Sequence, residues 1–235
     1  MRGGAVKADD LKIGGFQPFS GVDFPGALST VVFCQGCGLR CAYCHNPSLV
    51  DANAMTTLRW RDVEAHLEKR RGLIDAVVFS GGEPLLQRAL RPAAAAVKMR
   101  GMKVGLHTAG TAPERLRSLL PYLDWVGLDL KTSFERYEAL TGARDAGEKA
   151  RRSLEILAGA GVPFEARTTV WPDFHSVEEL VRLARIADEA GAAVFALQQA
   201  RDPVSQRPIA SALFADPTLI GLIRRACSRL AMRAA

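Results

Sequence analysis

The chain alternates short apolar runs with stretches of helical periodicity. Six of the runs are rich in Val and Phe and mostly apolar on both faces, which is typical of buried parallel strands. The stretches between them predict helices, and four of these end at a glycine where a C-terminal cap belongs: Gly72, Gly101, Gly161 and Gly191. The expected strands are Leu28–Phe33, Ala76–Ser80, Lys103–His107, Trp125–Leu130, Phe164–Val170 and Ala193–Leu197.

Six strand–helix units in succession predict an α/β fold, either an open partial (β/α)6 barrel of the TIM type or an open doubly wound sheet. We expect one domain over residues 1–235, made of an N-terminal extension (1–27), a barrel core (28–199) and a C-terminal helical closure (200–235). The expected helices are Trp60–Arg71, Gln87–Arg100, Pro113–Leu120, Glu148–Ala160 and Val177–Ala190, with a closing helix at about Pro217–Met232.

Length and composition argue against several protein classes. With 235 residues, of which 48% are hydrophobic, the chain can bury a sizeable core without disulfide staples. No apolar run approaches the roughly 18 residues of a membrane span, and the first residues contain no apolar signal segment. We therefore expect a cytoplasmic protein with no membrane partner.

The formal net charge of +6 is unevenly distributed. Residues 1–120 carry 16 Lys or Arg against 10 Asp or Glu, whereas residues 121–235 carry 15 of each kind. The basic residues are scattered and aromatic residues make up only 7%, whereas a nucleic-acid surface needs a basic stripe with stacking side chains. We expect no direct nucleic-acid binding; a basic face for an acidic protein or a polyanionic small molecule stays open.

Polar or metal-binding residues lie at or just past the carboxyl end of every expected strand. In both expected folds the carboxyl ends of the strands build the site, so these segments should converge on one face. Loops are polar in general, but this explains poorly why Lys131, Arg167 and two glutamines stand next to apolar strand positions. The six segments are Cys34–Cys44, Gly81–Glu83, His107–Thr108, Asp129–Lys131, Arg167–Thr169 and Gln198–Gln199.

Four of the five cysteines lie within eleven residues, and three of them form the run Cys37-Gly-Leu-Arg-Cys41-Ala-Tyr-Cys44. In a cytosolic chain such clustering indicates metal binding rather than disulfides. Three thiolates on a short loop can hold three corners of a cubane iron–sulfur cluster and leave one iron open. The alternatives are inert thiols or zinc, although zinc modules usually separate two Cys pairs by a dozen or more residues.

The C-x3-C-x2-C run, with Tyr43 before its last cysteine, resembles the signature of the radical SAM superfamily. The longer string Cys41–Pro47 (CAYCHNP), together with Asp23–Gly26 (DFPG), resembles the activating enzymes of glycyl radical enzymes. The resemblance runs from about Ile13 to Gln199, and it implies an open partial (β/α)6 barrel. The resemblance is greatest to the activating proteins of anaerobic ribonucleoside-triphosphate reductase. Four further segments contribute to it: Gly81–Pro84 (GGEP), Asp129–Lys131, Arg167–Val170 and Leu197–Gln199.

The resemblance implies two cofactors. Cys37, Cys41 and Cys44 would hold a [4Fe–4S] cluster, and S-adenosylmethionine would chelate its open iron through the methionyl amino and carboxylate groups. Residues implied to contact S-adenosylmethionine are Gly81, Gly82 and Glu83 at the amino group, Tyr43 by the adenine through its backbone, Thr108, Asp129 and Lys131 around the carboxylate and ribose, Arg167 at the carboxylate, and Gln198 and Gln199 at the adenine or ribose.

Several of these residues also have structural interpretations. GGEP alone is an ordinary turn, although glycines after a strand do let the backbone approach a ligand closely. Lys131 could form a surface salt bridge with Asp129, and Arg167 could pair within the barrel. The two glutamines could be satisfied polar residues at a barrel mouth.

The activity implied by the resemblance is reductive cleavage of S-adenosylmethionine to a 5′-deoxyadenosyl radical, which installs a glycyl radical on a partner enzyme. The implied partners are a glycyl radical enzyme and a flavodoxin- or ferredoxin-type electron donor. Anaerobic ribonucleoside-triphosphate reductase is the first candidate enzyme, and one of the pyruvate formate-lyase type is the alternative. Two other functions stay open: a radical SAM enzyme acting on a small molecule such as a purine-like heterocycle, and a ferredoxin-like electron carrier.

Two positions need separate interpretation. The electron carrier would use Cys34 as a fourth ligand, but Cys34 continues an apolar strand, which favours packing in the barrel wall. Where relatives often have Asp-Thr-Asn-Gly, this chain has His107-Thr108-Ala109-Gly110, so a monovalent cation that relatives bind there is in doubt. His45 and His175 are expected not to be ligands.

Overall fold

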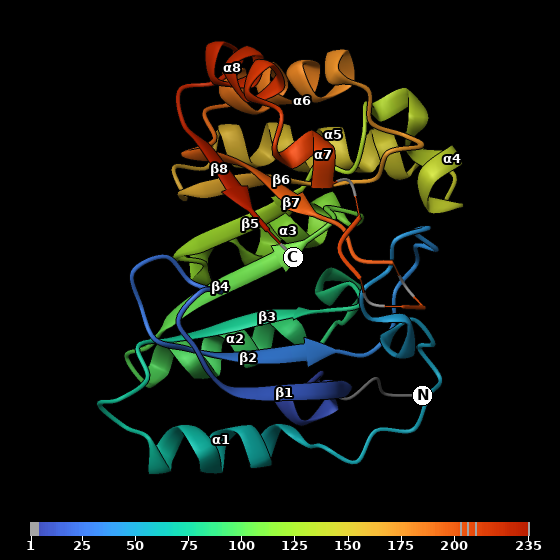
Figure 1. The fold of residues 1–235 in the computed structure, drawn as a ribbon. Coiled ribbons are helices and arrows are strands. Elements are labelled where there is room, and N and C mark those ends of the chain that lie inside the picture. Colours follow the sequence, from blue (N-terminus) through green and yellow to red (C-terminus); the bar gives the residue numbers. More distant parts are fainter. Residues whose placement is uncertain (1–4, 203, 206, 210, 235) are drawn as a thin grey trace. The chain divides into compact units, whose positions relative to one another are not determined.

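The computed structural model describes residues 5–202, 204–205, 207–209 and 211–234, and they fall into two compact units (Figure 1). The first unit takes in residues up to 38 and 48–126, and the second takes in 39–47 and 127 onward. Each unit combines strands with helices, which confirms the α/β class predicted from the alternation of apolar runs and helical periods.

The first unit is built on four strands: β1 (Ile13–Ser20), β2 (Ser29–Cys34), β3 (Ala76–Gly81) and β4 (Lys103–Thr108). β2, β3 and β4 run parallel, and β1 pairs antiparallel with β2. Its helices are α1 (Trp60–Lys69), α2 (Leu90–Met99) and α3 (Pro113–Leu119), with short 3-10 turns at Ala8–Asp10, Pro84–Leu86 and Leu120–Tyr122. In Figure 1, α2 lies behind β2 and β3.

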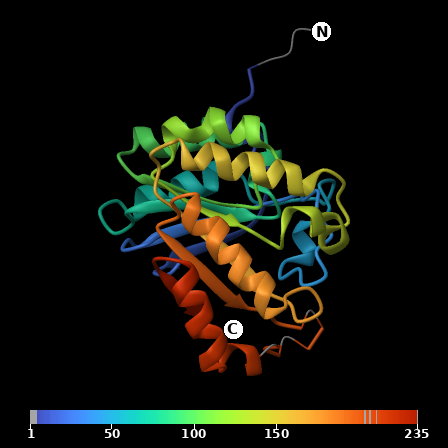
Figure 2. The same ribbon diagram turned by 90° about the horizontal axis from the view of Figure 1, so that it is seen from above.

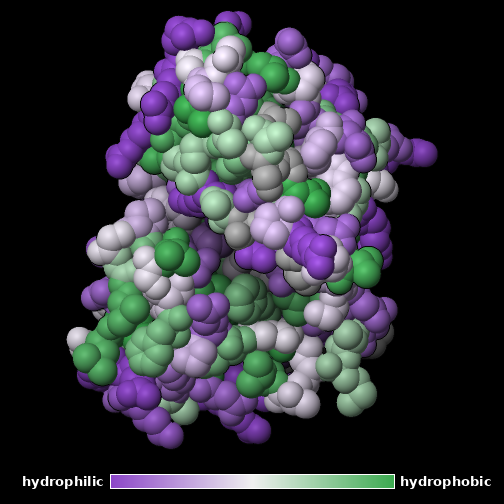
Figure 3. Space-filling view, in the orientation of Figure 1, coloured by the Kyte–Doolittle hydropathy of each residue, from purple (hydrophilic) through white to green (hydrophobic). Residues whose placement is uncertain are grey.

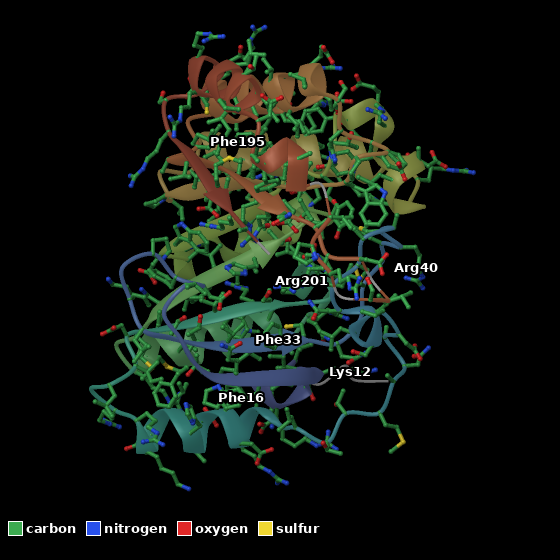
Figure 4. The ribbon with its side chains drawn as sticks, in the orientation of Figure 1. Lys12, Phe16, Phe33, Arg40, Phe195 and Arg201 are labelled. Atoms are coloured by element: carbon green, nitrogen blue, oxygen red, sulfur yellow. The ribbon has the colours of Figure 1, made fainter. Side chains whose placement is uncertain are left out.

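The core of this unit forms on both faces of β2 and β3, because their side chains are apolar at successive positions. One cluster joins Val31 and Val78 to Phe24 from the loop after β1, and the Phe24 ring lies 5.9 Å from that of Trp125. On the front of this unit, Phe33 of β2 covers Gly15 of β1, where an added Cβ would lie 3.3 Å from the ring (Figure 4). The space-filling view shows apolar side chains over this sheet face (Figure 3).

The second unit contains the rest of β5 (Trp125–Asp129), whose first two residues belong to the first unit, with β6 (Phe164–Val170), β7 (Val194–Gln199) and β8 (Leu230–Arg233). β6, β7 and β8 are parallel. Helices α6 and α8 lie side by side (Figures 1 and 2). The helices are α4 (Tyr137–Thr141), α5 (Ala146–Ala158), α6 (Val177–Glu189), α7 (Ser211–Phe214) and α8 (Pro217–Ala226).

All six expected strands are present; Phe164–Val170 has the expected bounds, and the bounds of the other five differ by one or two residues. The prediction that Gln198 and Gln199 follow a strand was wrong, because both lie inside β7. The expected N-terminal extension contains β1, whose Gly14, Gly15 and Pro18 obscure the alternation of a strand. Among the described residues, no helix is long and apolar enough to cross a membrane.

The expected closing helix was also wrong in its second half. α8 ends at Ala226, Cys227 is extended (φ −145°, ψ 150°), and Leu230–Arg233 form β8 beside β7. The backbone of β7 needs hydrogen-bond partners along this edge, and that demand outweighs the helical periodicity of a four-residue segment. The strand is also fixed by Arg233, whose guanidinium donates to both oxygens of Glu165 at 2.7 Å.

Candidate functional site

The cysteine loop starts and ends in the first unit, where the side chain of Gln35, at its start, hydrogen-bonds to residues at its end. The Gln35 amide donates to the carbonyls of Ser48 (3.0 Å) and Asp51 (2.7 Å). Two backbone hydrogen bonds reinforce this, from Gly36 to Leu49 (2.8 Å) and from Cys37 to Val50 (3.0 Å). The residues that enter and leave the loop are therefore fixed next to each other. Gln35 was missed by the sequence reasoning, which considered only the cysteines.

Cys34 and Cys37 have different environments. Cys34 is the last residue of β2 and has no exposed surface, as the continuation of the apolar strand predicted. Burial raises the pKa of its thiol far above the usual range, and the charge of Glu83 raises it further. Cys37 is partly exposed on the loop. A thiolate, which is the metal-binding form, is therefore strongly disfavoured at Cys34.

Gly81, the last residue of β3, and Gly82, the next residue, lie against the start of the cysteine loop. Gly82 donates its N–H to Cys34 O and Glu83 donates to Gly36 O, both at 2.9 Å. Gly81 has φ +110°, and a Cβ there would lie 2.5 Å from Cys34 N; a Cβ on Gly82 would lie 2.4 Å from Gly36 O. The protein's own backbone therefore requires glycine at both positions.

The carboxylate of Glu83 joins the end of β3 to the end of β4. It is completely buried and accepts hydrogen bonds from Thr108 Oγ1 (2.6 Å), Ala109 N (2.8 Å) and Leu85 N (3.1 Å). The Thr108 hydroxyl in turn accepts from Gly110 N at 2.9 Å. Glu83 and Thr108, both predicted to contact S-adenosylmethionine, are thus partners of each other. Such a satisfied network fixes the two strand ends relative to one another.

His107 connects β4 to the Asp23–Gly26 segment. Its Nε2 lies 3.0 Å from the carbonyl of Asp23, and its Nδ1 lies 3.4 Å from Ser80 Oγ and 3.9 Å from the Asp23 carboxylate. The ring packs edge-on against Trp125, with centroids 5.4 Å apart. Two segments that the sequence analysis singled out separately, DFPG and HTAG, are therefore in direct contact through this histidine.

The rest of the cysteine loop, residues 39–47, packs in the second unit. Cys41 and Cys44 are partly exposed and form a turn in which Cys44 N donates to Cys41 O at 3.1 Å. Between them, Tyr43 is buried against Trp171, Leu140 and Ala200. Among the described residues, its hydroxyl is a buried polar atom without a hydrogen-bond partner. The Tyr43 ring anchors the turn and leaves the two thiols at its surface.

The donor set fits an iron–sulfur cluster. None of the five cysteines, all of which the structure describes, forms a disulfide, and the three of the signature are partly exposed. Among the described residues, no three His, Cys, Asp or Glu side chains lie close enough together to hold a single metal ion. A four-iron cluster does not need such a group, because each cysteine binds a different iron.

A partly buried group of charges lies at the carboxyl end of β5 in the second unit. The Asp129 carboxylate lies between two cations, with Lys131 Nζ 3.2 Å from Oδ2, and Arg167 Nε at 3.2 Å and Nη2 at 3.1 Å from Oδ1. Gly127 makes room for Arg167, since a Cβ there would lie 2.7 Å from Cζ. Two cations on one carboxylate leave an excess positive charge, which suits an anionic ligand.

Lys131 is only 9% exposed, and its Nζ lies 5.6 Å from the centre of the Tyr43 ring. Burial disfavours the ammonium, but Tyr43 and Asp129 outweigh that cost and hold the pKa of Lys131 well above its usual value. The salt bridge to Asp129 suggested by the sequence is therefore present, and it is partly buried, with the Asp129 side chain 31% exposed.

We expect Lys131→Met to weaken S-adenosylmethionine binding by about 1.5–3 kcal/mol, the contribution of a charge-assisted hydrogen bond. The substitution nearly preserves the side-chain volume, and Asp129 still has Arg167 as an ion-pair partner. An anaerobic binding titration measures the effect, with Lys149→Met on exposed α5 as the matched control. Equal affinity in the parent and the Lys131 variant would leave Lys131 as an ion-pair partner only.

Four side chains that the sequence reasoning did not assign hold the segment after β5. Tyr137 Oη accepts from Lys131 N (2.9 Å), and Thr168 Oγ1 donates to Leu130 O (2.7 Å). His175 Nε2 donates to Lys131 O (2.7 Å), and the Glu179 carboxylate accepts from Thr132 Oγ1 (2.8 Å). His175 thus supports the Lys131 backbone. Tyr137, His175 and Glu179 lie in no motif, whereas Thr168 lies within Arg167–Val170. Only the fold brings the four side chains to this segment.

The protein should lose stability as the pH falls below about 6.5, the pKa of an unfolded histidine, partly because of His175. Burial lowers the pKa of His175 in the folded state, and its Nδ1 accepts from Trp171 N, so the folded protein holds it neutral. Below pH ~6.5 the unfolded chain binds a proton that the folded chain does not, and this favours unfolding.

Urea denaturation measured at several pH values tests this, with His175→Gln as the variant. Glutamine can still donate to Lys131 O but does not titrate, so the variant should show a weaker pH dependence. His45 and His66, whose pKa values are also lowered, are present in both proteins, so their contributions to the pH dependence cancel in the comparison. Parallel losses in parent and variant would show that His175 contributes nothing.

The predicted site residues are divided between the two units. Gln199 is nearly buried, and its amide donates to Ile209 O at 3.0 Å, so it also supports the chain after β7. The first unit contains Cys37, Gly81, Gly82, Glu83 and Thr108, and the second contains Cys41, Tyr43, Cys44, Asp129, Lys131, Arg167 and Gln199.

Comparison with known proteins identifies the family. The model of the radical SAM superfamily matches residues 31–184. The chain is 30% identical over 195 residues to a protein of Methanocaldococcus jannaschii that is assigned by name to the glycyl-radical enzyme activating enzymes, covering 80% of this chain and 79% of the relative. It is 33% identical over 167 residues to the pyruvate formate-lyase-activating enzyme of Clostridium pasteurianum, covering 68% and 69%.

A solved structure shows the same fold. SuiB of Streptococcus suis, bound to S-adenosylmethionine, matches with a TM-score of 0.68 at 16% identity, over 86% of this chain and 48% of SuiB. The chain therefore spans about half the length of that structure. Enzymes of this superfamily use a [4Fe–4S] cluster and S-adenosylmethionine, as the cysteine signature predicted. The chain belongs to the radical SAM superfamily and, within it, to the family of glycyl-radical enzyme activating enzymes.

Proposed function

We propose that this protein uses a [4Fe–4S] cluster and S-adenosylmethionine to install a glycyl radical on a partner enzyme. Family membership supports the proposal. The observation that carries it is the contrast among the cysteines: Cys37, Cys41 and Cys44 are partly exposed on one loop, whereas Cys34 is buried in β2. An electron carrier with four cysteine ligands would need Cys34 on the loop as well.

The residues of the chain have distinct roles in this proposal. When bound, the two cofactors supply one-electron cleavage of S-adenosylmethionine and, with it, hydrogen abstraction from a glycine. Cys37, Cys41 and Cys44 would hold the cluster, and the Lys131–Asp129–Arg167 group would bind the methionyl carboxylate through its excess positive charge. The Glu83 network and Gln35 would hold the loop in place.

We propose two candidate partner enzymes, in the order in which they should be tested. Anaerobic ribonucleoside-triphosphate reductase comes first, because the motifs after the strands resemble those of its activating proteins. Pyruvate formate-lyase comes second, because the relative from Clostridium pasteurianum acts on it by name.

To test the proposal, the protein is reconstituted anaerobically and reduced with dithionite. The yield of 5′-deoxyadenosine is then measured for the protein by itself and for the protein mixed with each candidate partner. We expect one partner to raise the yield, and its Gly→Ala variant at the radical position to abolish the increase. A yield that neither enzyme changes, but that a purine-like heterocycle raises while being consumed, would overturn the proposal in favour of a small-molecule substrate.

A further inference from the structure

A shallow hollow in the first unit is lined by three arginines. Its volume is about 200 Å³, and it lies between the segment that follows β3 and helix α3. Arg88 lines it from the segment just before α2, Arg91 from the first turn of α2, and Arg115 from α3. Among the described residues, no acidic side chain lines it. The hollow therefore presents only positive charge to an incoming molecule.

These arginines carry a charge that the rest of the chain does not balance. Segment 84–119 contains seven Lys or Arg and one Glu, so its formal charge of +6 equals that of the whole chain. Three of its cations have carboxylate partners, in the pairs Lys98–Asp124, Arg100–Glu64 and Arg117–Glu114. The three arginines of the hollow have none among the described residues.

The contacts of the three arginines leave their charge available. Arg115 donates to the neutral carbonyls of Leu85 (3.0 Å) and Leu86, and Arg91 lies 5.8 Å from the centre of the Tyr122 ring. Arg88 makes no hydrogen bond or ion pair within the part of the chain that the structure describes, and all three side chains are exposed. Exposed, unneutralised guanidinium groups are typical of surfaces that attract carboxylates.

The hollow is connected to the cysteine loop by one side chain. Gln87, which also lines the hollow, donates from Nε2 to the carbonyl of Gln35 at 2.6 Å. Gln35 precedes Cys37 by two residues and holds the loop by its own side chain. A molecule bound at the hollow would therefore lie beside the segment that leads to the proposed cluster.

We propose that this hollow is the docking site of an acidic electron-donor protein, whose surface carboxylates pair with Arg88, Arg91 and Arg115. The inference rests on the proposed function, in which one electron must leave a donor protein with a reduced flavin or iron–sulfur group and enter the cluster. No bond is made or broken in this step. At about 200 Å³ the hollow is smaller than pockets for small molecules, which span roughly 300–1,000 Å³.

The position of the hollow distinguishes the electron donor from the glycyl radical enzyme. A glycine that loses a hydrogen atom must touch the reacting group, which the fold places at the carboxyl ends of the strands. The hollow is lined by the segment after the carboxyl end of β3 and by side chains of α2 and α3, and Figure 1 shows α2 behind the strands. An electron donor needs only to come close to the cluster, so a site on the helical layer suits it.

The binding test uses a bacterial flavodoxin with a net negative charge as the probe. Arg88→Glu/Arg91→Glu should weaken its affinity for the reconstituted protein about tenfold or more at low salt, and the difference should shrink as salt screens the charges. Arg115 is left intact because it supports the backbone after Glu83. The matched control is Arg224→Glu/Arg225→Glu on exposed α8, which changes the net charge equally. Equal weakening in both double variants, or in neither, would overturn the docking site.

An activity test separates this inference from the proposed function. With dithionite as reductant, the Arg88/Arg91 double variant should cleave S-adenosylmethionine at the parent rate; with reduced flavodoxin, it should be about tenfold or more slower at low salt. Failure of the parent with dithionite would count against the proposed function alone. Loss of the dithionite-driven reaction in the double variant, or weaker binding of the glycyl radical enzyme instead of flavodoxin, would overturn the assignment of the hollow.

Discussion

Cys41→Ser is expected to lose the four-iron cluster and, with it, reductive cleavage of S-adenosylmethionine. Cys41 and Cys44 are partly exposed on a turn that the buried Tyr43 ring anchors, so each can hold one iron of the cluster. Serine is not a usual ligand of such clusters, which bind cysteine thiolates. The same result is expected for Cys37→Ser and Cys44→Ser. Iron and sulfide content after anaerobic reconstitution, together with 5′-deoxyadenosine yield, measures the effect.

Cys34→Ser is the matched control, three residues before Cys37. We expect it to keep the cluster and near-parent cleavage, because Cys34 is fully buried in β2 and its thiol is held protonated. Loss of the cluster in Cys34→Ser, together with a paramagnetic resonance spectrum of the parent that does not respond to S-adenosylmethionine, would contradict the account and favour an electron carrier with four cysteine ligands.

Glu83→Ala is expected to lower the free energy of unfolding by about 3 kcal/mol or more, because it leaves three buried donors without their acceptor. Those donors are Thr108 Oγ1, Ala109 N and Leu85 N. The ends of β3 and β4 would lose the group that joins them. Equilibrium urea denaturation followed by circular dichroism measures the loss.

Two variants show whether the network is responsible. Glu83→Gln keeps one acceptor oxygen and should lose less stability than Glu83→Ala. Glu114→Ala removes an exposed carboxylate of α3 and should change stability by less than about 0.5 kcal/mol. If Glu83→Ala were as stable as the parent but bound S-adenosylmethionine poorly, Glu83 would be a ligand contact rather than a structural connection.

Most of the fold could be predicted from the chain because its strands are apolar on both faces and its helices are amphipathic. The predictions failed where local pattern and tertiary pairing disagree. In β1, two glycines and a proline hide a strand that depends on pairing with β2. In β8, the four residues Leu230–Arg233 follow a helical pattern but complete the hydrogen bonding of β7. Neither pairing can be predicted from the segment alone, because each depends on the strand that lies beside it.

The candidate site was predictable where its residues stand in motifs. The motifs singled out the signature cysteines, the two glycines at the end of β3, and Asp129 with Lys131, which the structure shows as an ion pair. The supporting residues were not predictable, because each acts through a contact made by the fold. Gln35 binds the residues at which the cysteine loop ends, and Tyr137, His175 and Glu179 bind the segment after β5. GGEP shows the intermediate case. The segment does lie at the end of β3, and the structure shows that the Glu83 carboxylate accepts hydrogen bonds from Thr108 and from backbone N–H groups.

The most direct test of the central claim is electron paramagnetic resonance of the partner enzyme after anaerobic incubation with this protein, S-adenosylmethionine and dithionite. The account predicts a stable glycyl radical signal on one of the two candidate partners. The signal should be absent when the Cys41→Ser variant is used, and absent when the partner's radical glycine is replaced by alanine. A protein that cleaves S-adenosylmethionine but leaves both partners without a glycyl signal would contradict the account.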